Sequence, residues 1–144
     1  MYELFMLKGK LYIYKGKVTI DEHLSGQVQP SHVINNLMPT VGRVYTLTES
    51  LSNIDEVRLG DDNTARVSSD MDLYNPLFTA YPTDKRVVGT KRITELFVGV
   101  NEANFMHREI GIFAEGALIS TLVMSDFEKT TAKTRTYIHE MGWL

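Results

Sequence analysis

Clustered acidic residues are the first in this chain whose type and spacing could do chemistry. Asp61 and Asp62, followed by Asn63, form one polar segment, and Asp70 and Asp72 lie in the next. Carboxylate and amide oxygens are the ligands that Ca²⁺ prefers. The spacing is not that of an EF-hand loop, and Asp and Asn also favour turns because their side chains bond to nearby backbone. We therefore predict turns here, with a calcium site as the alternative.

Histidines are the second group of residues that could bind a metal or move a proton. No pair has the i, i+2 spacing of one strand face, or the i, i+3 or i, i+4 spacing of one helix face. A zinc site needs three or four convergent ligands, so the pattern predicts no metal. We interpret the histidines as four separate surface or half-buried residues: His23, His32, His107 and His139.

Sequence patterns of nucleophilic or cofactor-dependent catalysis are absent from this chain. It contains no cysteine, so no thiol nucleophile or thiolate ligand is available. It contains no G-x-S-x-G elbow, no P-loop and no dinucleotide-binding fingerprint. The sequence therefore predicts a protein without a cofactor and without catalysis. A pair of carboxylates acting as general acid and base is the remaining enzymatic alternative.

The charge balance argues against nucleic acid as a partner, and the short apolar runs argue against a membrane. The formal net charge is −3, whereas nucleic-acid binders usually carry a basic face. The one basic cluster is Lys85, Arg86, Lys91 and Arg92. A solvated strand face or an acidic protein partner explains this cluster better than phosphate binding does. No apolar run approaches the roughly 20 residues that span a bilayer.

The first part of the chain predicts a β-hairpin and one short helix. Lys10–Tyr14 and Lys17–Asp21 alternate polar and apolar residues around a Lys15-Gly16 turn, which predicts a hairpin region over residues 1–29. A helix is expected over residues 30–39, because Pro is tolerated in a first helical turn and Pro39 disfavours continuation. The expected buried stripe of this helix is Val33, Ile34, Leu37 and Met38.

The rest of the chain predicts the main sandwich, residues 43–144 of a single β domain spanning residues 1–144. Its strands are expected at residues 43–48, 54–59, 77–81, 86–100, 108–113, 117–124 and 133–143. Polar or Gly-containing turns separate them, including residues 101–104 and the segment Ala114-Glu115-Gly116. Short strands at this spacing predict an antiparallel β-sandwich of about eight strands with one short helix.

Aromatic residues and methionines suggest that part of the surface is covered by other chains. The chain has seven Tyr, six Phe, seven Met and one Trp, and Tyr, Phe and Met are enriched in interface cores. Several lie outside the alternation of one inner face, and both ends of the chain are apolar. We predict five interface residues, with plain core filling as the alternative: Tyr12, Tyr14, Tyr74, Phe105 and Trp143.

The second half of the chain carries a family resemblance. Its strongest stretch is Asn101-Glu102-Ala103-Asn104 followed by Arg108-Glu109-Ile110-Gly111-Ile112-Phe113-Ala114-Glu115-Gly116-Ala117-Leu118-Ile119. With residues 57–77 and Glu128-Lys129-Thr130, this resembles a family of tailed-bacteriophage structural proteins. In that family a "GxGtT…tDtaL" segment precedes "sEAN…rEiGLFa.dG.L" and "eKt". Here Gly60-Asp61-Asp62 replaces the usual Gly-x-Gly turn.

The resemblance implies that the functional residues are packing residues. The motif residues are Glu109, Gly111, Phe113 and Gly116. Gly111 is expected to leave room for a crossing side chain or backbone, as strand glycines often do. Gly116 is expected in the turn of a hairpin.

The resemblance also implies a place for the chain in a tailed-phage or prophage particle, assembled in the bacterial host cytoplasm. The expected partners are other virion structural proteins and further copies of the chain in a ring or trimer. A tail, baseplate or fibre-attachment role is slightly favoured, and a capsid decoration protein is the alternative. A carbohydrate-binding β-sandwich module is a more distant alternative.

Overall fold

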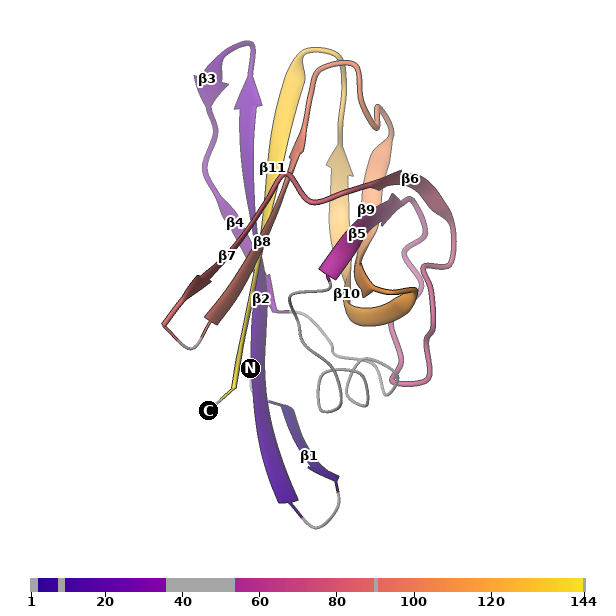
Figure 1. Ribbon diagram of the computed structural model, residues 1–144. Helices are drawn as coiled ribbons and strands as arrows, with labels where there is room; N and C mark the ends of the chain where they lie inside the picture. The colour runs from indigo at the N-terminus through magenta and orange to yellow at the C-terminus, as the bar shows by residue number, and fades with distance from the viewer. Residues whose placement is uncertain (1–2, 8–9, 36–53, 90, 144) are drawn as a thin grey trace.

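The computed structural model describes residues 3–7, 10–35, 54–89 and 91–143, and the regular secondary structure of this part is all β-strand (Figure 1). The strands are β1 (Glu3–Leu7), β2 (Lys10–Leu24), β3 (Gln27–Val28), β4 (His32–Asn35), β5 (Ile54–Gly60), β6 (Pro76–Ala80), β7 (Asp84–Val88), β8 (Lys91–Val98), β9 (Met106–Ala114), β10 (Ala117–Glu128) and β11 (Lys133–Trp143). Within these residues, no helix is long and apolar enough to cross a membrane.

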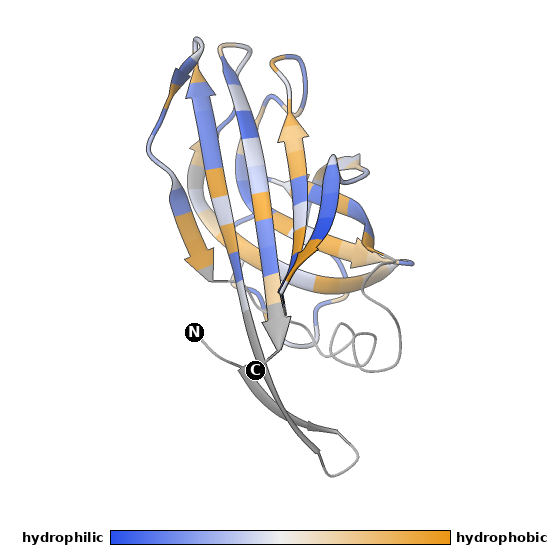
Figure 2. Cartoon of the chain, turned by 60° about the vertical axis from the view of Figure 1, so that its left-hand side comes forward, coloured by the Kyte–Doolittle hydropathy of each residue, from blue (hydrophilic) through white to orange (hydrophobic). Residues whose placement is uncertain are grey.

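The strands form two antiparallel sheets, which confirms the mainly-β sandwich. The larger sheet has the order β1-β2-β11-β8-β7, and β3 and β4 also pair with β2. The smaller sheet has the order β10-β9-β5-β6. Their facing sides share one apolar core, which includes Val18, Leu96 and Tyr137 of the larger sheet and Leu59 and Ile112 of the smaller sheet. Figure 2 shows the alternation of polar and apolar residues along the strands of the larger sheet.

The smaller sheet is also covered on its outer side. Every residue of β9 from Glu109 to Ala114 is buried, which a strand with one solvated face would not show. Residues 61–75, here called the 61–75 loop, run over this side between β5 and β6 and bury Leu73 against it. This double burial explains why the sequence from 109 to 114 does not alternate.

The predicted hairpin turn at Lys15-Gly16 is wrong. β2 runs through both residues, and its pairing with β11 continues without a shift from Leu24 opposite Lys133 to Tyr14 opposite Trp143. The ladder with a distant strand outweighs a local Gly turn signal.

The predicted helix over residues 30–39 is wrong where the structure describes it. Residues His32–Asn35 form β4, which pairs with Lys17–Ile20 of β2. Val33 and Ile34 are β-branched and fit an edge strand better than a helix. Residues 36–39 and the predicted strand at 43–48 lie outside the described part of the chain.

The predicted strand over residues 86–100 is a hairpin instead. β7 and β8 pair with each other, and Gly89 between them has a φ of +62°. A positive φ favours glycine, so this residue allows the reversal.

The predicted hairpin around residues 114–116 is confirmed. Glu115 has a φ of 50° and Gly116 a φ of 84° between β9 and β10. Two positive φ values in a two-residue loop match a type I′ turn, whose twist suits antiparallel strands. The strands predicted at 54–59, 77–81, 117–124 and 133–143 are also present, with ends that differ by a few residues.

Candidate functional site

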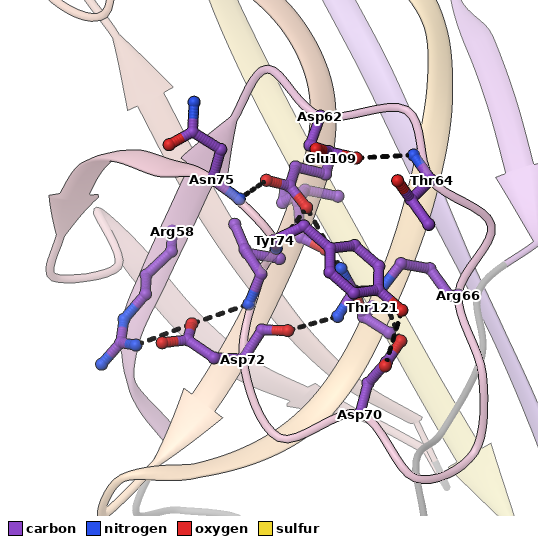
Figure 3. A network of polar contacts seen from close by, with 12 residues as sticks. Arg58, Asp62, Thr64, Arg66, Asp70, Asp72, Tyr74, Asn75, Glu109 and Thr121 are labelled. Carbon is purple, nitrogen blue, oxygen red and sulfur yellow. Dashed lines mark hydrogen bonds and ion pairs between the residues drawn. The ribbon is translucent and has the colours of Figure 1, made fainter.

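The carboxylate of Glu109 is buried beneath the 61–75 loop and holds that loop in place (Figure 3). Glu109 lies on β9 opposite Gly60 of β5. Its Oε1 accepts a hydrogen bond from the backbone N–H of Asn75 at 2.7 Å, and its Oε2 accepts one from the N–H of Tyr74 at 2.9 Å. Nη1 of Arg66 donates to Oε2 at 3.1 Å. One side chain of the smaller sheet thus fastens the loop at its middle and at its end.

Two glycines leave the space that this arrangement needs. A Cβ on Gly60 would collide with the Glu109 carboxylate and with the carbonyl oxygen of Asn75. A Cβ on Gly111 would lie 2.9 to 3.1 Å from three side chains, those of Phe113, Leu118 and Leu73. The expectation that Gly111 leaves room for crossing groups is therefore confirmed.

Arg66 links the interior of the 61–75 loop to its surface. Its side chain is 4% exposed, and its Nε lies 3.2 Å from Oδ2 of Asp70. Nη2 donates to the carbonyl oxygen of Asp72 at 2.5 Å, and the guanidinium lies 4.6 Å from the ring centroid of Tyr74. The Tyr74 hydroxyl donates to Asp70 at 2.9 Å, and this hydrogen bond raises the pKa of Tyr74.

A second arginine attaches the loop from outside. Arg58 of β5 donates to Glu56 at 2.8 Å and to Asp72 at 2.9 Å. The guanidinium of Arg58 also lies 4.0 Å from the ring centroid of Phe113, which is buried on β9. The loop is therefore held by charged contacts from both β5 and β9.

The four aspartates that were the alternative calcium ligands each bind a donor of the protein. Asp70 accepts from Tyr74 and from the N–H of Val67. The other three accept hydrogen bonds as follows: Asp61 from the Asn75 amide at 2.6 Å, Asp62 from the Thr64 N–H at 2.7 Å, and Asp72 from Arg58 and from the Leu73 N–H. Within the described residues, no three acidic or histidine side chains are placed to hold a metal together. In this structure the four aspartates are turn and ion-pair residues.

A second buried polar group, here called the His107 cluster, lies between the two sheets. Nε2 of His107 lies 2.8 Å from the carbonyl oxygen of Ala103, so this nitrogen carries the proton and donates. Nδ1 then accepts, from the Tyr137 hydroxyl at 2.6 Å and from Nη1 of Arg135 at 2.9 Å. Arg135 also donates to Glu22 of β2 at 2.5 Å. The cluster ties β9 to β11 and β2.

Burial sets the protonation of the His107 cluster. It lowers the pKa of His107 to about 4 and raises the pKa of Tyr137 to about 12. Burial would also raise the pKa of Glu22, but the hydrogen bond and charge of Arg135 outweigh it and lower that pKa. The imidazole is therefore neutral at pH 7, while the guanidinium and the carboxylate are both charged.

The interpretation of all four histidines as surface or half-buried residues is wrong for two of them. His107 is fully buried in its cluster, and His139 of β11 is 1% exposed, with a pKa lowered by burial to about 4. His23 and His32 are exposed. Strand spacing alone cannot reveal this difference, because it depends on which face of β11 and β9 meets the other sheet.

The predicted interface residues do not form one patch among the described side chains. Tyr74 is 44% exposed but is engaged with Arg66 and Asp70. Phe105 is half-buried against the core, with its ring 4.7 Å from that of His107. The side chains of Tyr12, Tyr14 and Trp143 lie outside the description, although the backbone of Tyr14 pairs with that of Trp143.

The predicted basic cluster is spread along the β7–β8 hairpin. Arg86 bonds to Asp84 and Glu95, both at 2.7 Å. Lys85 donates to the carbonyl oxygen of Ile54 at 2.7 Å. Much of this cluster is thus part of a salt-bridged strand face, which agrees with one of the two interpretations made from the sequence.

Residues that the sequence analysis did not single out complete both buried groups. Arg66 lies in the polar segment between Asp62 and Asp70, and its spacing of four from Asp70 is the signal that could have paired them. Arg135 alternates with Tyr137 and His139 on β11, and this odd-numbered series marks the inner face. Their partners on β2 and β9 are distant in sequence and carry no local signal.

The geometry supports a structural role for the Glu109 network, which we define as the Glu109 carboxylate with Arg66 and the backbone N–H groups of Tyr74 and Asn75. The carboxylate is fully enclosed, and three donors bind its two oxygens. Such a group fixes backbone conformation, as carboxylates bound by several donors do. No family model, curated protein or solved structure matches this chain.

Proposed function

We propose that this chain is a non-catalytic structural component of a tailed-phage or prophage particle, where many copies assemble through protein–protein contacts. The observation that carries the proposal is the Glu109 network. Glu109 is the central acidic residue of the motif that resembles phage structural proteins, and it fixes a surface loop in one conformation. A fixed surface loop suits a protein that must meet its neighbours in the same way in every copy.

The energetics of burial favour shape over stability as the purpose of this network. Removing two charges from water costs several kcal/mol each, and well-packed apolar residues often give equal or greater stability. Both Glu109 and Arg66 are nonetheless enclosed, at 0% and 4% side-chain exposure. This buried ion pair gives the 61–75 loop a defined path. The loop presents Val67 and Met71 to solvent at 49% and 71% exposure. Exposed apolar residues on a fixed loop favour contact with another protein.

A second feature that favours assembly is the ribbon formed by β1 and the start of β2. In the described structure, residues 10–13 of β2 pair with β1 but not with β11, whose pairing begins at Tyr14. Figure 1 shows this end reaching beyond the rest of the sheet. A two-stranded ribbon is at best marginally stable alone in water. Its register pairs Leu4 with Ile13 and Phe5 with Tyr12.

The experiment that tests the proposal is labelling of intact particles with a gold-conjugated antibody against the chain. We favour label at the tail tip, baseplate or neck. Label over the shell would instead make the chain a capsid decoration protein. Particles that carry no label, from a lysate in which the chain is expressed, would contradict the proposal.

A carbohydrate-binding module is the second candidate, favoured by one observation. Tyr81 is 80% exposed and lines an open hollow of about 290 Å³ with Asp55, Glu56, Thr79 and Ala80. An exposed ring beside carboxylates is a combination that sugars bind. Titration of the chain with cell-surface oligosaccharides, followed by NMR shifts at Tyr81, tests this candidate. The absence of shifts would remove it.

A further inference from the structure

The outer surface of the 61–75 loop is acidic and partly apolar. The loop contains four aspartates and a single arginine, Arg66, which is enclosed beneath it and pairs with Asp70, whose side chain is only 9% exposed. Asp72 keeps a side-chain exposure of 46% although it bonds to Arg58. Val67 and Met71 are the exposed apolar residues of the same loop. Because the Glu109 network fixes the backbone, this surface is formed before any partner arrives, which lowers the entropic cost of association.

The free end of the β7–β8 hairpin has the complementary character. Val87 and Val88 of edge strand β7 are 59% and 54% exposed. Their register partners are Arg92 and Lys91, so this end of the hairpin carries Val87 with Arg92 on one face and Val88 with Lys91 on the other. Lys91 lies 3.9 Å from Glu140 and remains 56% exposed. We call these four residues the basic edge patch.

We propose that copies of this chain associate head to tail, with the 61–75 loop of one copy against the basic edge patch of the next. The occupant of each surface is a second copy, because the chain supplies both halves of the match: acidic with basic, and apolar with apolar. This inference deepens the proposed function by naming its contact surface. β7 carries charged residues, which disfavour the addition of another strand at that edge. The proposed contact is therefore made by side chains and not by backbone pairing.

The position of the two surfaces suits a repeating contact. Figure 1 shows the 61–75 loop on one side of the molecule and β7 on the opposite side. A contact between two different surfaces is heterologous, and it leaves one surface of each kind open on every pair. Addition of further copies then continues until the rotation between neighbours closes a ring.

The test is a charge exchange across the proposed contact, with mass in solution measured by light scattering at matched concentrations of the full chain. Met71→Lys places a positive charge on the loop against the basic edge patch, and Val87→Glu places a negative charge on that patch against the loop. Each single substitution should weaken association by about tenfold or more, because like charges then face each other. The wild-type chain should be oligomeric, and high salt should weaken its association.

Recombination of the two substitutions gives the decisive result. The double variant should regain the wild-type mass. An equimolar mixture of the two single variants should associate where neither variant does alone, because a contact between unlike variants is either wild-type or oppositely charged. A misfolded variant could not be rescued in this way. Val28→Lys, at a residue 74% exposed on β3, is the matched control and should leave the mass unchanged.

Three outcomes would overturn the inference: a monomeric wild-type chain, single variants that keep the wild-type mass, or a mixture that stays dissociated. These outcomes are distinguishable from failure of the virion assignment. Labelled particles with no charge-exchange effect would reject only the contact surface. Unlabelled particles with a full charge-exchange effect would reject only the virion assignment.

Discussion

The Glu109 network and the His107 cluster both bury charged groups, but they lie in different parts of the molecule. Both enclose an arginine and pair it with a carboxylate, Arg66 with Glu109 and Arg135 with Glu22. The Glu109 network lies on the outer side of the smaller sheet and binds backbone N–H groups of a loop. The His107 cluster lies between the sheets and joins side chains of β2, β9 and β11.

The difference lies in what each arrangement determines. Loss of the His107 cluster would loosen the joint between two sheets that also share a large apolar core. Loss of the Glu109 carboxylate would take one charged partner from the buried Arg66 and would free a loop that has little apolar packing besides Leu73. The His107 cluster supports a fold that an apolar core also stabilises. The Glu109 network determines the shape of a loop that few other contacts hold.

The largest expected effect is at Glu109. Glu109→Ala takes a buried carboxylate from Arg66, which keeps Asp70 and the carbonyl oxygen of Asp72, and leaves two backbone N–H groups buried and unbonded. It should reduce the free energy of unfolding by about 3–5 kcal/mol. Chemical denaturation measures the change. Asp84→Ala is the matched control, because it removes an exposed carboxylate from Arg86 and should cost less than about 1 kcal/mol. Equal losses in the two variants would contradict the importance of burial.

The next effect is pH dependence, which should arise in the region between the sheets. The pKa of His107 and of His139 is about 4 in the folded chain, against an ordinary value of 6.5. The unfolded chain therefore takes up protons first as the pH falls. Stability is complete above pH 6.5 and is lost between pH 6.5 and 4, by up to about 3 kcal/mol for each residue.

Urea unfolding between pH 7.5 and 4 measures this dependence. His107→Gln keeps a donor and an acceptor at the site but does not titrate, so the slope with pH should fall to about half. An unchanged slope in that variant would place the titrating group elsewhere.

A smaller effect separates geometry from charge in the His107 cluster. Tyr137→Phe removes one of the two donors to Nδ1 of His107 and leaves Arg135 as the other. The free energy of unfolding should fall by about 1 kcal/mol, as for a single buried hydrogen bond. Thermal unfolding gives the value. A loss as large as that of Glu109→Ala would mean that both clusters depend on every member equally.

The smallest effect is expected outside both clusters and should be stabilising. Ser25 has a φ of 51° and precedes Gly26, with a φ of 81°, in the turn between β2 and β3. Asn adopts this conformation more readily than Ser, so Ser25→Asn should raise stability by roughly a few tenths of a kcal/mol. A decrease in thermal stability would contradict this description of the turn.

Local sequence signals predicted the second half of the fold better than the first. The Glu115-Gly116 turn and the strands around it follow from nearest neighbours along the chain. The continuous β2 and the strand β4 depend instead on pairing with each other and with β11, more than a hundred residues away in sequence. A Lys-Gly turn signal and a helical stripe are weak beside such a ladder.

The candidate site was predictable in part for the same reason. The motif identified Glu109, Gly111 and Phe113 as packing residues, and all three are buried. What Glu109 binds was not predictable, because the N–H groups of Tyr74 and Asn75 belong to backbone and leave no side-chain pattern. The contribution of Arg66 was hidden among acidic neighbours that also suit turns or calcium.

The most direct test of the account is hydrogen exchange at the backbone amides of Tyr74 and Asn75, measured by NMR. The account holds that the Glu109 carboxylate fixes the 61–75 loop through these two amides. Both should then exchange nearly as slowly as core amides of β9, and Glu109→Gln should speed them selectively. Exchange of both amides in the wild-type chain at the rate of an open loop would contradict the account.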